Sequence, residues 1–254
     1  MMLKGKTAII TGGSYGIGRG IARVFAENGA ETLVCARGAG RLEDTVALIQ
    51  AETGRKVLSQ VCDVSKREDV ERITAYAMEA FGHIDILVNN AAIQQYIPVL
   101  DMPDEFWDDH FAINVKGVFM FTQVVAREMV KAGNGKIINI ASDSGCAPLP
   151  DNASAYCASK AAVISFTRNA AKELGPLGVY CNAISPGAIG GTAMMDHFID
   201  YTNGVGAQQC IDGAALRRLG TPEDIGKVAL FLASDMSDFI TGENILVTGG
   251  DLMR

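Results

Sequence analysis

A tyrosine and a lysine stand four residues apart in the segment Tyr156-Cys157-Ala158-Ser159-Lys160. The segment has a helical composition, so both side chains are expected on one face of a helix. A phenol acts as an acid and base near neutrality only if its pKa falls from about 10 to about 7 or 8. A neighbouring ammonium in a partly desolvated cleft favours such a fall by its charge. The pair therefore predicts proton transfer at Tyr156, although this spacing alone is common in proteins.

A serine ends the apolar run that precedes this pair. Ser142 follows Ile137-Ile138-Asn139-Ile140-Ala141, which has the pattern of a buried strand. Parallel sheets bind their ligands at the carboxyl ends of the strands. We therefore expect the Ser142 hydroxyl to hold a substrate oxygen beside Tyr156.

The first apolar run leads into a glycine-rich loop, Thr11-Gly12-Gly13-Ser14-Tyr15-Gly16-Ile17-Gly18, and a helical pattern follows it. Glycines at 12, 16 and 18 permit a tight turn, close approach to a pyrophosphate and close packing, while the helix N-terminus offers free N–H groups to an anion. The spacing is GxxxGxG rather than GxGxxG, and the GxxxxGK[ST] pattern of a triphosphate site is missing. An ordinary glycine-rich turn is the alternative, but the flanking strand and helix favour a dinucleotide site.

The second apolar run ends in Cys35-Ala36-Arg37. Dinucleotide folds that prefer NAD carry a carboxylate there, which accepts hydrogen bonds from the ribose hydroxyls. A guanidinium in its place pairs with a 2′-phosphate. The sequence therefore predicts NADP(H) in preference to NAD(H), unless Arg37 is only a solvated surface residue.

Seven short apolar runs alternate with helical patterns along the chain. Because most of these runs are apolar throughout, both faces of their sheet should be covered, as in parallel strands joined by crossover helices. This predicts an α/β fold, a Rossmann-type doubly wound seven-stranded parallel sheet, in a single domain spanning residues 1–254. The expected strands are Thr7 to Thr11, Glu31 to Cys35, Lys56 to Asp63, Ile84 to Asn89, Lys136 to Ala141, Val179 to Ser185 and Asn244 to Thr248. The expected helices are Ile17 to Asn28, Arg41 to Thr53, Lys66 to Phe81, Glu105 to Lys131, Ser154 to Leu174 and Pro222 to Ser234.

Residues 187–219 interrupt this rhythm, being rich in Gly, Met and Ala and too long for an ordinary connection. Long loops after parallel strands commonly hold ligands, so we expect a substrate lid here. The alternative is a surface excursion with a helix or two.

Composition excludes several other classes of protein. The net charge is -7 and the 22 Lys and Arg residues form no stripe, which argues against nucleic acid as a partner. No apolar run reaches the roughly 18 residues of a membrane span, and no secretory signal opens the sequence. The six cysteines and three histidines lack disulfide or metal-ligand spacing, so no metal is expected. We expect a cytoplasmic protein that acts on a small molecule.

Taken together, these motifs resemble the short-chain dehydrogenase/reductase family from about Leu3 to Met253. The matching positions, in the family's order, are Thr11 to Gly18, Asp63, Asn89-Asn90-Ala91-Ala92, Asn114, Ser142, Tyr156 with Lys160, and Pro186-Gly187. The resemblance implies a tetrad in which Tyr156 is the acid and base, Ser142 orients the substrate oxygen, Lys160 lowers the tyrosine pKa and holds the nicotinamide ribose, and Asn114 keeps a proton-relay water. It also implies that Asp63 contacts the adenine, that Asn90 lies at the adenosine ribose, and that the chain forms a homotetramer. The cofactor-binding set that follows is Gly12, Ser14, Tyr15, Gly16, Ile17, Gly18, Arg37, Asp63, Val64, Asn90, Ala91, Tyr156, Lys160, Pro186, Gly187 and Ile189.

Two positions depart from the family pattern. Ala92 stands where the family prefers glycine, which adds a methyl group near the nicotinamide. Thr192 lies one residue later than the family's threonine, so its hydrogen bond to the carboxamide is in question.

The expected activity is reversible hydride transfer between a nicotinamide cofactor and a secondary alcohol or carbonyl compound. Family members of this length resemble both 3-oxoacyl thioester reductases and sugar, polyol or steroid dehydrogenases, and the sequence does not choose between them. A cofactor-binding regulator without turnover is the alternative from another class, because a fold alone does not guarantee chemistry.

Overall fold

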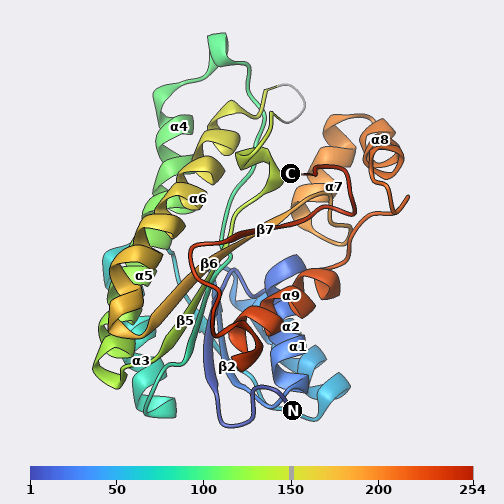
Figure 1. Ribbon diagram of the computed structural model, residues 1–254. Helices are drawn as coiled ribbons and strands as arrows, with labels where there is room; N and C mark the ends of the chain where they lie inside the picture. The colour runs from blue at the N-terminus through green and yellow to red at the C-terminus, as the bar shows by residue number, and fades with distance from the viewer. Residues whose placement is uncertain (149–151, 254) are drawn as a thin grey trace.

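A computed structural model describes residues 1–148 and 152–253. It contains a seven-stranded sheet in the order β3-β2-β1-β4-β5-β6-β7, with every neighbouring pair parallel (Figure 1). The strands are β1 (Thr7–Thr11), β2 (Glu31–Ala36), β3 (Leu58–Val61), β4 (Ile86–Asn89), β5 (Gly135–Ile140), β6 (Val179–Pro186) and β7 (Asn244–Val247). The order reverses between β1 and β4, which is the switch point where such sheets bind ligands.

The central strands are buried along their whole length, as their apolar composition predicts. Every residue of β1, β4 and β5 is buried. The prediction of a doubly wound parallel sheet is therefore confirmed. Some strands are shorter than expected. β3 covers only the middle of the predicted Lys56 to Asp63 run; it lies at the sheet edge with a partner strand on one side, and its residues are half-buried or exposed.

Helices cover both faces of the sheet (Figure 1). One core cluster joins the sheet to α1, α2 and α9 through side chains such as Phe25, Ile49 and Ile225, and the other joins it to α3, α5 and α6 through Ile73 and Phe121 among others. The helices are α1 (Gly16–Glu27), α2 (Ala39–Thr53), α3 (Arg67–Phe81), α4 (Asp104–Phe111), α5 (Gly117–Ala132), α6 (Ser154–Leu174), α7 (Ala193–Tyr201), α8 (Val205–Gly213) and α9 (Pro222–Ala233). None of the helices in the described residues is both long and apolar enough to cross a membrane.

The expected helix from Glu105 to Lys131 is present, but it is not α-helical throughout. The structure has α4, then a π-helical turn (η2, Ala112–Lys116), then α5. A π turn inserts one extra residue into the helix, and such turns are frequent at functional sites. Here the inserted turn carries Asn114, whose side chain bonds outside its own helix.

Residues 187–219 form α7 and α8, which rise from the carboxyl end of β6 (Figure 1). Thr192 caps α7 by accepting a 3.1 Å hydrogen bond from the Met195 backbone N–H. Thr221 and Asp224 form a reciprocal capping box at the start of α9, which fixes the return of the chain to the sheet.

Candidate active site

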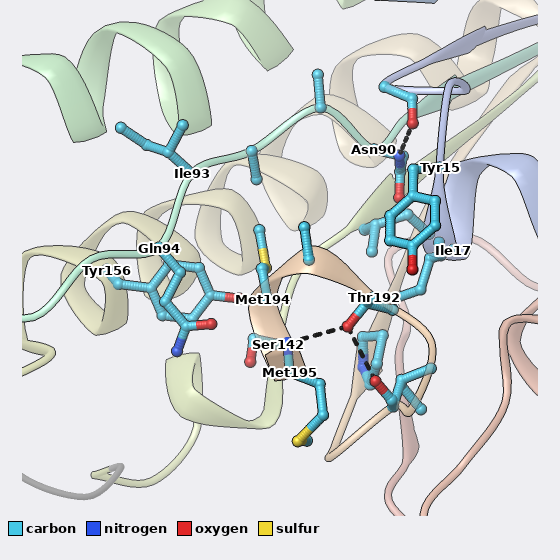
Figure 2. Close-up of a pocket in the computed structure, with 18 of the residues that line it drawn as sticks. Tyr15, Ile17, Asn90, Ile93, Gln94, Ser142, Tyr156, Thr192, Met194 and Met195 are labelled. Carbon is cyan, nitrogen blue, oxygen red and sulfur yellow. Dashed lines mark hydrogen bonds between the residues drawn. The ribbon is translucent and has the colours of Figure 1, made fainter. Parts of the chain in front are cut away.

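A cavity of about 770 Å³ opens at the carboxyl ends of the central strands. Figure 2 shows Tyr15 and Asn90 on one side of it and Tyr156 on the other, with Ser142 and with Met194 and Met195 of α7 between them. The cavity brings together every predicted site residue except Gly18 and Asn114, which lie behind its wall and hold it in place.

The glycine loop has the conformation that its composition predicts. Gly12 and Gly16 have positive φ angles of 64° and 55°, which side chains rarely adopt. A Cβ on Gly18 would overlap the Gly12 carbonyl group, 2.8 Å from its carbon. Tyr15, the N-cap of α1, makes no capping hydrogen bond, so the first N–H groups of the helix keep their capacity for an anion. These features fit the pyrophosphate of a dinucleotide.

Asn90 holds the glycine loop in its shape. Its side-chain N–H₂ donates to the carbonyl oxygens of Thr11 at 2.9 Å and Gly12 at 3.1 Å. The Thr11 hydroxyl in turn accepts from the backbone N–H groups of Asn90 and Ala91. Both amide protons of the side chain are therefore used within the protein, where they position the loop. Only the side-chain carbonyl oxygen of Asn90 remains to accept a hydrogen bond from a ribose.

The end of the cavity beside β2 carries positive charge. Arg37 and Arg41 both line it and are both exposed, and the Arg41 guanidinium lies 5.9 Å from the centre of the Tyr15 ring. Asp63 lies at the same end and accepts hydrogen bonds from the backbone N–H and hydroxyl of Ser65, which lower its pKa. Asp63 is thus a charged acceptor at the place where the family resemblance puts the adenine.

Tyr156, Ser142 and Lys160 are buried on one wall of the cavity. Tyr156 and Lys160 lie on one face of α6, with the Lys160 Nζ 5.6 Å from the centre of the tyrosine ring, and Ser142 lies just beyond β5. The Ser142 hydroxyl is 2.7 Å from that of Ser144 and 3.0 Å from Asp143 Oδ1. The three side chains expected to carry the chemistry therefore share one site.

The charges of the protein alone do not lower the tyrosine pKa. Burial raises the pKa of Tyr156 above its ordinary value, and the Ser142 hydroxyl opposes that rise by hydrogen bonding. Burial also lowers the pKa of Lys160 to about 7. A phenolate at Tyr156 therefore requires Lys160 in its charged form together with a cationic ligand, such as the oxidised nicotinamide ring.

Asn114 is a buried brace between three segments. Its Oδ1 accepts from the Ile93 backbone N–H at 2.8 Å, and its Nδ2 donates to the Ile93 carbonyl at 2.9 Å and to the Ser159 hydroxyl at 3.0 Å. Ser159 donates to the Tyr156 carbonyl oxygen at 2.7 Å. Both amide protons of Asn114 are therefore used within the protein. The relay water implied by the family resemblance remains a prediction.

Thr192 uses its hydroxyl inside the protein. It donates to the Ile189 carbonyl at 2.9 Å and accepts from the Met195 N–H, as Figure 2 shows. Its methyl group lies against the glycine loop, 3.1 Å from where a Cβ of Gly16 would stand. Thr192, which lies one residue later than the family's threonine, thus caps α7. Its hydroxyl proton is already used in the hydrogen bond to Ile189.

The sequence interpretation missed an aromatic cluster at the end of the cavity near Tyr156, which we call the substrate end. Tyr96 stacks on Tyr201 of α7, with ring centroids 4.4 Å apart, and on His197 at 5.4 Å. Asp143, directly after Ser142, and Asp251, near the end of the described chain, also line the cavity. The place of Asp143 at a strand end was a usable signal, whereas no local pattern marks Tyr96 or Asp251. Among residues 1–148 and 152–253, no cluster of His, Cys, Asp or Glu side chains is arranged to hold a metal ion.

Comparison with known proteins finds relatives along nearly the whole chain. The family model described as Enoyl-(Acyl carrier protein) reductase matches residues 12–251. Dehydrogenase/reductase SDR family member 4 of Sus scrofa is 36% identical over 99% of this chain and 89% of the relative. The NAD-dependent glycerol dehydrogenase of Listeria innocua is 35% identical over 96% of this chain and 93% of the relative.

Solved structures show the same likeness. A short-chain type dehydrogenase/reductase from Mycobacterium marinum superposes with a TM-score of 0.93 at 38% identity, covering 99% of this chain and 97% of the other. NAD⁺-bound xylitol dehydrogenase gives 0.93 at 34% identity, covering 98% and 100%. Fold and site thus define a Rossmann-type oxidoreductase that takes a nicotinamide cofactor. The chain belongs to the short-chain dehydrogenase/reductase family.

Proposed function

We propose that this protein interconverts a secondary alcohol and a carbonyl compound, with Tyr156 as general acid and base. The observation that carries the proposal is that Tyr156, Ser142 and Lys160 line the same cavity as the glycine loop. A dinucleotide held at the loop would direct its nicotinamide toward these three side chains. The non-catalytic alternative leaves unexplained why a phenol, a hydroxyl and an amine are buried together at this wall.

In the proposed reaction the Tyr156 hydroxyl gives its proton to the oxygen of a bound carbonyl, and takes one from the alcohol in the reverse direction. The Ser142 hydroxyl orients that oxygen. Lys160 in its charged form stabilises the phenolate left on Tyr156. The nicotinamide, when bound, supplies or accepts the hydride. Asn114 and Ser159 keep α6 and the segment around Ile93 in register, so that the phenol stays aimed at the cavity.

We further propose that NADP(H) is preferred over NAD(H). Arg37 and Arg41 line the cavity beside β2, and residues 36–38 contain no carboxylate to repel a 2′-phosphate. Two of the proteins compared above are described with NAD, so the substitution at Arg37 argued in the Discussion bears directly on this preference. Residues 187–219 serve in this proposal as the lid over the substrate end.

The test is consumption of NADPH and NADH with a panel of ketones, aldehydes and 3-oxoacyl thioesters, read at the absorbance of the reduced ring. Replacing Tyr156→Phe should lower kcat by at least about a hundredfold while the cofactor dissociation constant stays the same. The matched control is Tyr76→Phe on α3, outside the cavity. Full activity of Tyr156→Phe would refute the proposed role.

A further inference from the structure

The carboxylate of Asp143 lies beside the catalytic wall, and its two oxygens have different surroundings. Oδ1 accepts hydrogen bonds from the Ser142 hydroxyl at 3.0 Å, the Ser144 N–H at 2.7 Å and the Ser144 hydroxyl at 3.2 Å. Within the described part of the chain, every hydrogen bond to this carboxylate ends on Oδ1. Oδ2 lies near Gly187, 3.3 Å from where a Cβ would stand on that glycine. Asp143 lines the cavity, and its Oδ2 accepts no hydrogen bond from the described residues, so Oδ2 keeps its acceptor capacity.

Within residues 1–148 and 152–253, Asp143 has no cationic side chain in an ion pair with it. Among the described residues, the cationic side chains that line the cavity are Arg37 and Arg41, at the far end beside β2, and Lys160, whose amine donates to the Ile140 carbonyl at 2.8 Å. Asp251 adds a second carboxylate to the lining, and the pKa of Asp143 is raised mainly by burial and further by the Asp251 charge. The substrate end is thus anionic, and the opposite end is cationic.

A half-buried carboxylate is an acceptor without a donor of its own. It gains most from a ligand that brings a hydroxyl proton, and it repels a ligand that brings a second negative charge. We propose that Asp143 is a specificity-determining residue that selects substrates with a hydrogen-bond donor on the carbon next to the reacting centre. This inference rests on the proposed alcohol–carbonyl function. The substrate class is a vicinal diol or its hydroxyketone, and substrates with an adjacent carboxylate, and anionic acyl-carrier thioesters, are disfavoured.

Three small alcohols that differ in a single substituent test this selection. Propane-1,2-diol, 2-butanol and lactate share the CH₃–CHOH group and carry CH₂OH, CH₂CH₃ and COO⁻ beside it. Their dissociation constants are measured by titration of the enzyme with reduced nicotinamide bound, using the fluorescence of that ring, because the reduced cofactor cannot oxidise them. We expect the diol to bind about tenfold or more tightly than 2-butanol, and lactate to bind most weakly.

The variant Asp143→Asn keeps the shape of the side chain and removes its charge. We expect it to shrink the diol advantage to about threefold or less and to improve lactate binding by about tenfold, since the repulsion is gone. Asp108→Asn, at an exposed carboxylate of α4 outside the cavity, should leave all three constants as in the wild type. The inference is overturned if lactate binds as tightly as the diol in the wild type, or if Asp143→Asn keeps the wild-type order and ratios.

Turnover is measured separately, with hydroxyacetone, 2-butanone and pyruvate as the matching ketones. Binding in the expected order without consumption of reduced nicotinamide by any carbonyl compound would refute the proposed function and leave the selection by Asp143 standing. Turnover with pyruvate favoured over hydroxyacetone would do the opposite. The two failures are therefore distinguishable.

Discussion

The side-chain amine of Lys160 donates a 2.8 Å hydrogen bond to the carbonyl oxygen of Ile140, the last residue of β5. This contact ties α6 to the strand end that precedes Ser142, so the lysine both positions the catalytic wall and brings a titratable group into it. Burial lowers the pKa of Lys160 to about 7, well below that of a lysine in an unfolded chain.

A pH-dependent stability follows from that burial. Between pH 7 and the unfolded pKa near 10.5, the unfolded chain binds a proton at Lys160 that the folded chain does not. The contribution of Lys160 to stability therefore rises with pH in that window, by at most about 1.4 kcal/mol per pH unit. We expect the unfolding free energy of the wild type, relative to that of Lys160→Met, to be larger at pH 8.5 than at pH 7. Urea unfolding of the cofactor-free proteins at the two pH values measures this, and a difference independent of pH would show that Lys160 is not desolvated.

The glycine loop offers a prediction with a built-in control. A Cβ on Gly18 would overlap the Gly12 carbonyl and lie 2.5 Å from the Asn90 side-chain nitrogen, whereas a Cβ on Gly175, outside the cavity, would have no atom within 4 Å. We expect Gly18→Ala to weaken cofactor binding by at least about tenfold, because the loop must move away from the helix N-terminus. Gly175→Ala should bind the cofactor almost as the wild type does. Fluorescence titration with NADPH compares the two, and equal dissociation constants would contradict the tight packing of α1 on the loop.

The brace at Asn114 predicts a loss of stability. Replacing Asn114→Ala leaves the N–H and C=O of Ile93 without their side-chain partner, and unpaired partly buried groups cost about 1 to 3 kcal/mol each. We expect about 2 to 4 kcal/mol less unfolding free energy, measured by urea unfolding. Asn169→Ala serves as control, since its side chain makes one exposed bond to the Ser165 carbonyl. An equally small effect in both variants would mean that water replaces the Asn114 amide.

How much of this could be predicted from the sequence depends on the range of the interactions involved. The parallel sheet was predictable because its strands are apolar runs, and the positions of Ser142 and Tyr156 follow from a strand end and a helix face. The hydrogen-bond partners of Asn114 in the π turn were not predictable, because Ile93 and Ser159 are far away in the sequence. The role of the Thr192 hydroxyl was not predicted either, since it became clear only from the fold that this hydroxyl caps α7.

The same limit applies to the charge of the cavity. Local sequence indicates Arg37 as a phosphate partner, yet the anionic substrate end arises from Asp143 and Asp251, which are brought together only by the fold. Homotetramer formation, implied by the family resemblance, remains a prediction for the same reason: it depends on surfaces of a second chain.

Cofactor choice is the prediction that most directly tests the sequence interpretation. Arg37 is exposed at the cavity. Hydrogen bonds from Ser65 lower the pKa of Asp63 nearby, and the Arg37 charge lowers it further. Replacing Arg37→Asp removes the partner of a 2′-phosphate and supplies an acceptor for ribose hydroxyls, so the ratio of kcat/KM for NADPH over NADH should fall by about tenfold to a thousandfold. Arg55→Asp, at an exposed arginine outside the cavity, controls for the change in net charge and should leave the ratio as it is. If the ratio is the same in Arg37→Asp and the wild type, the guanidinium is a solvated surface group, and the preference for NADP(H) has no support from this position.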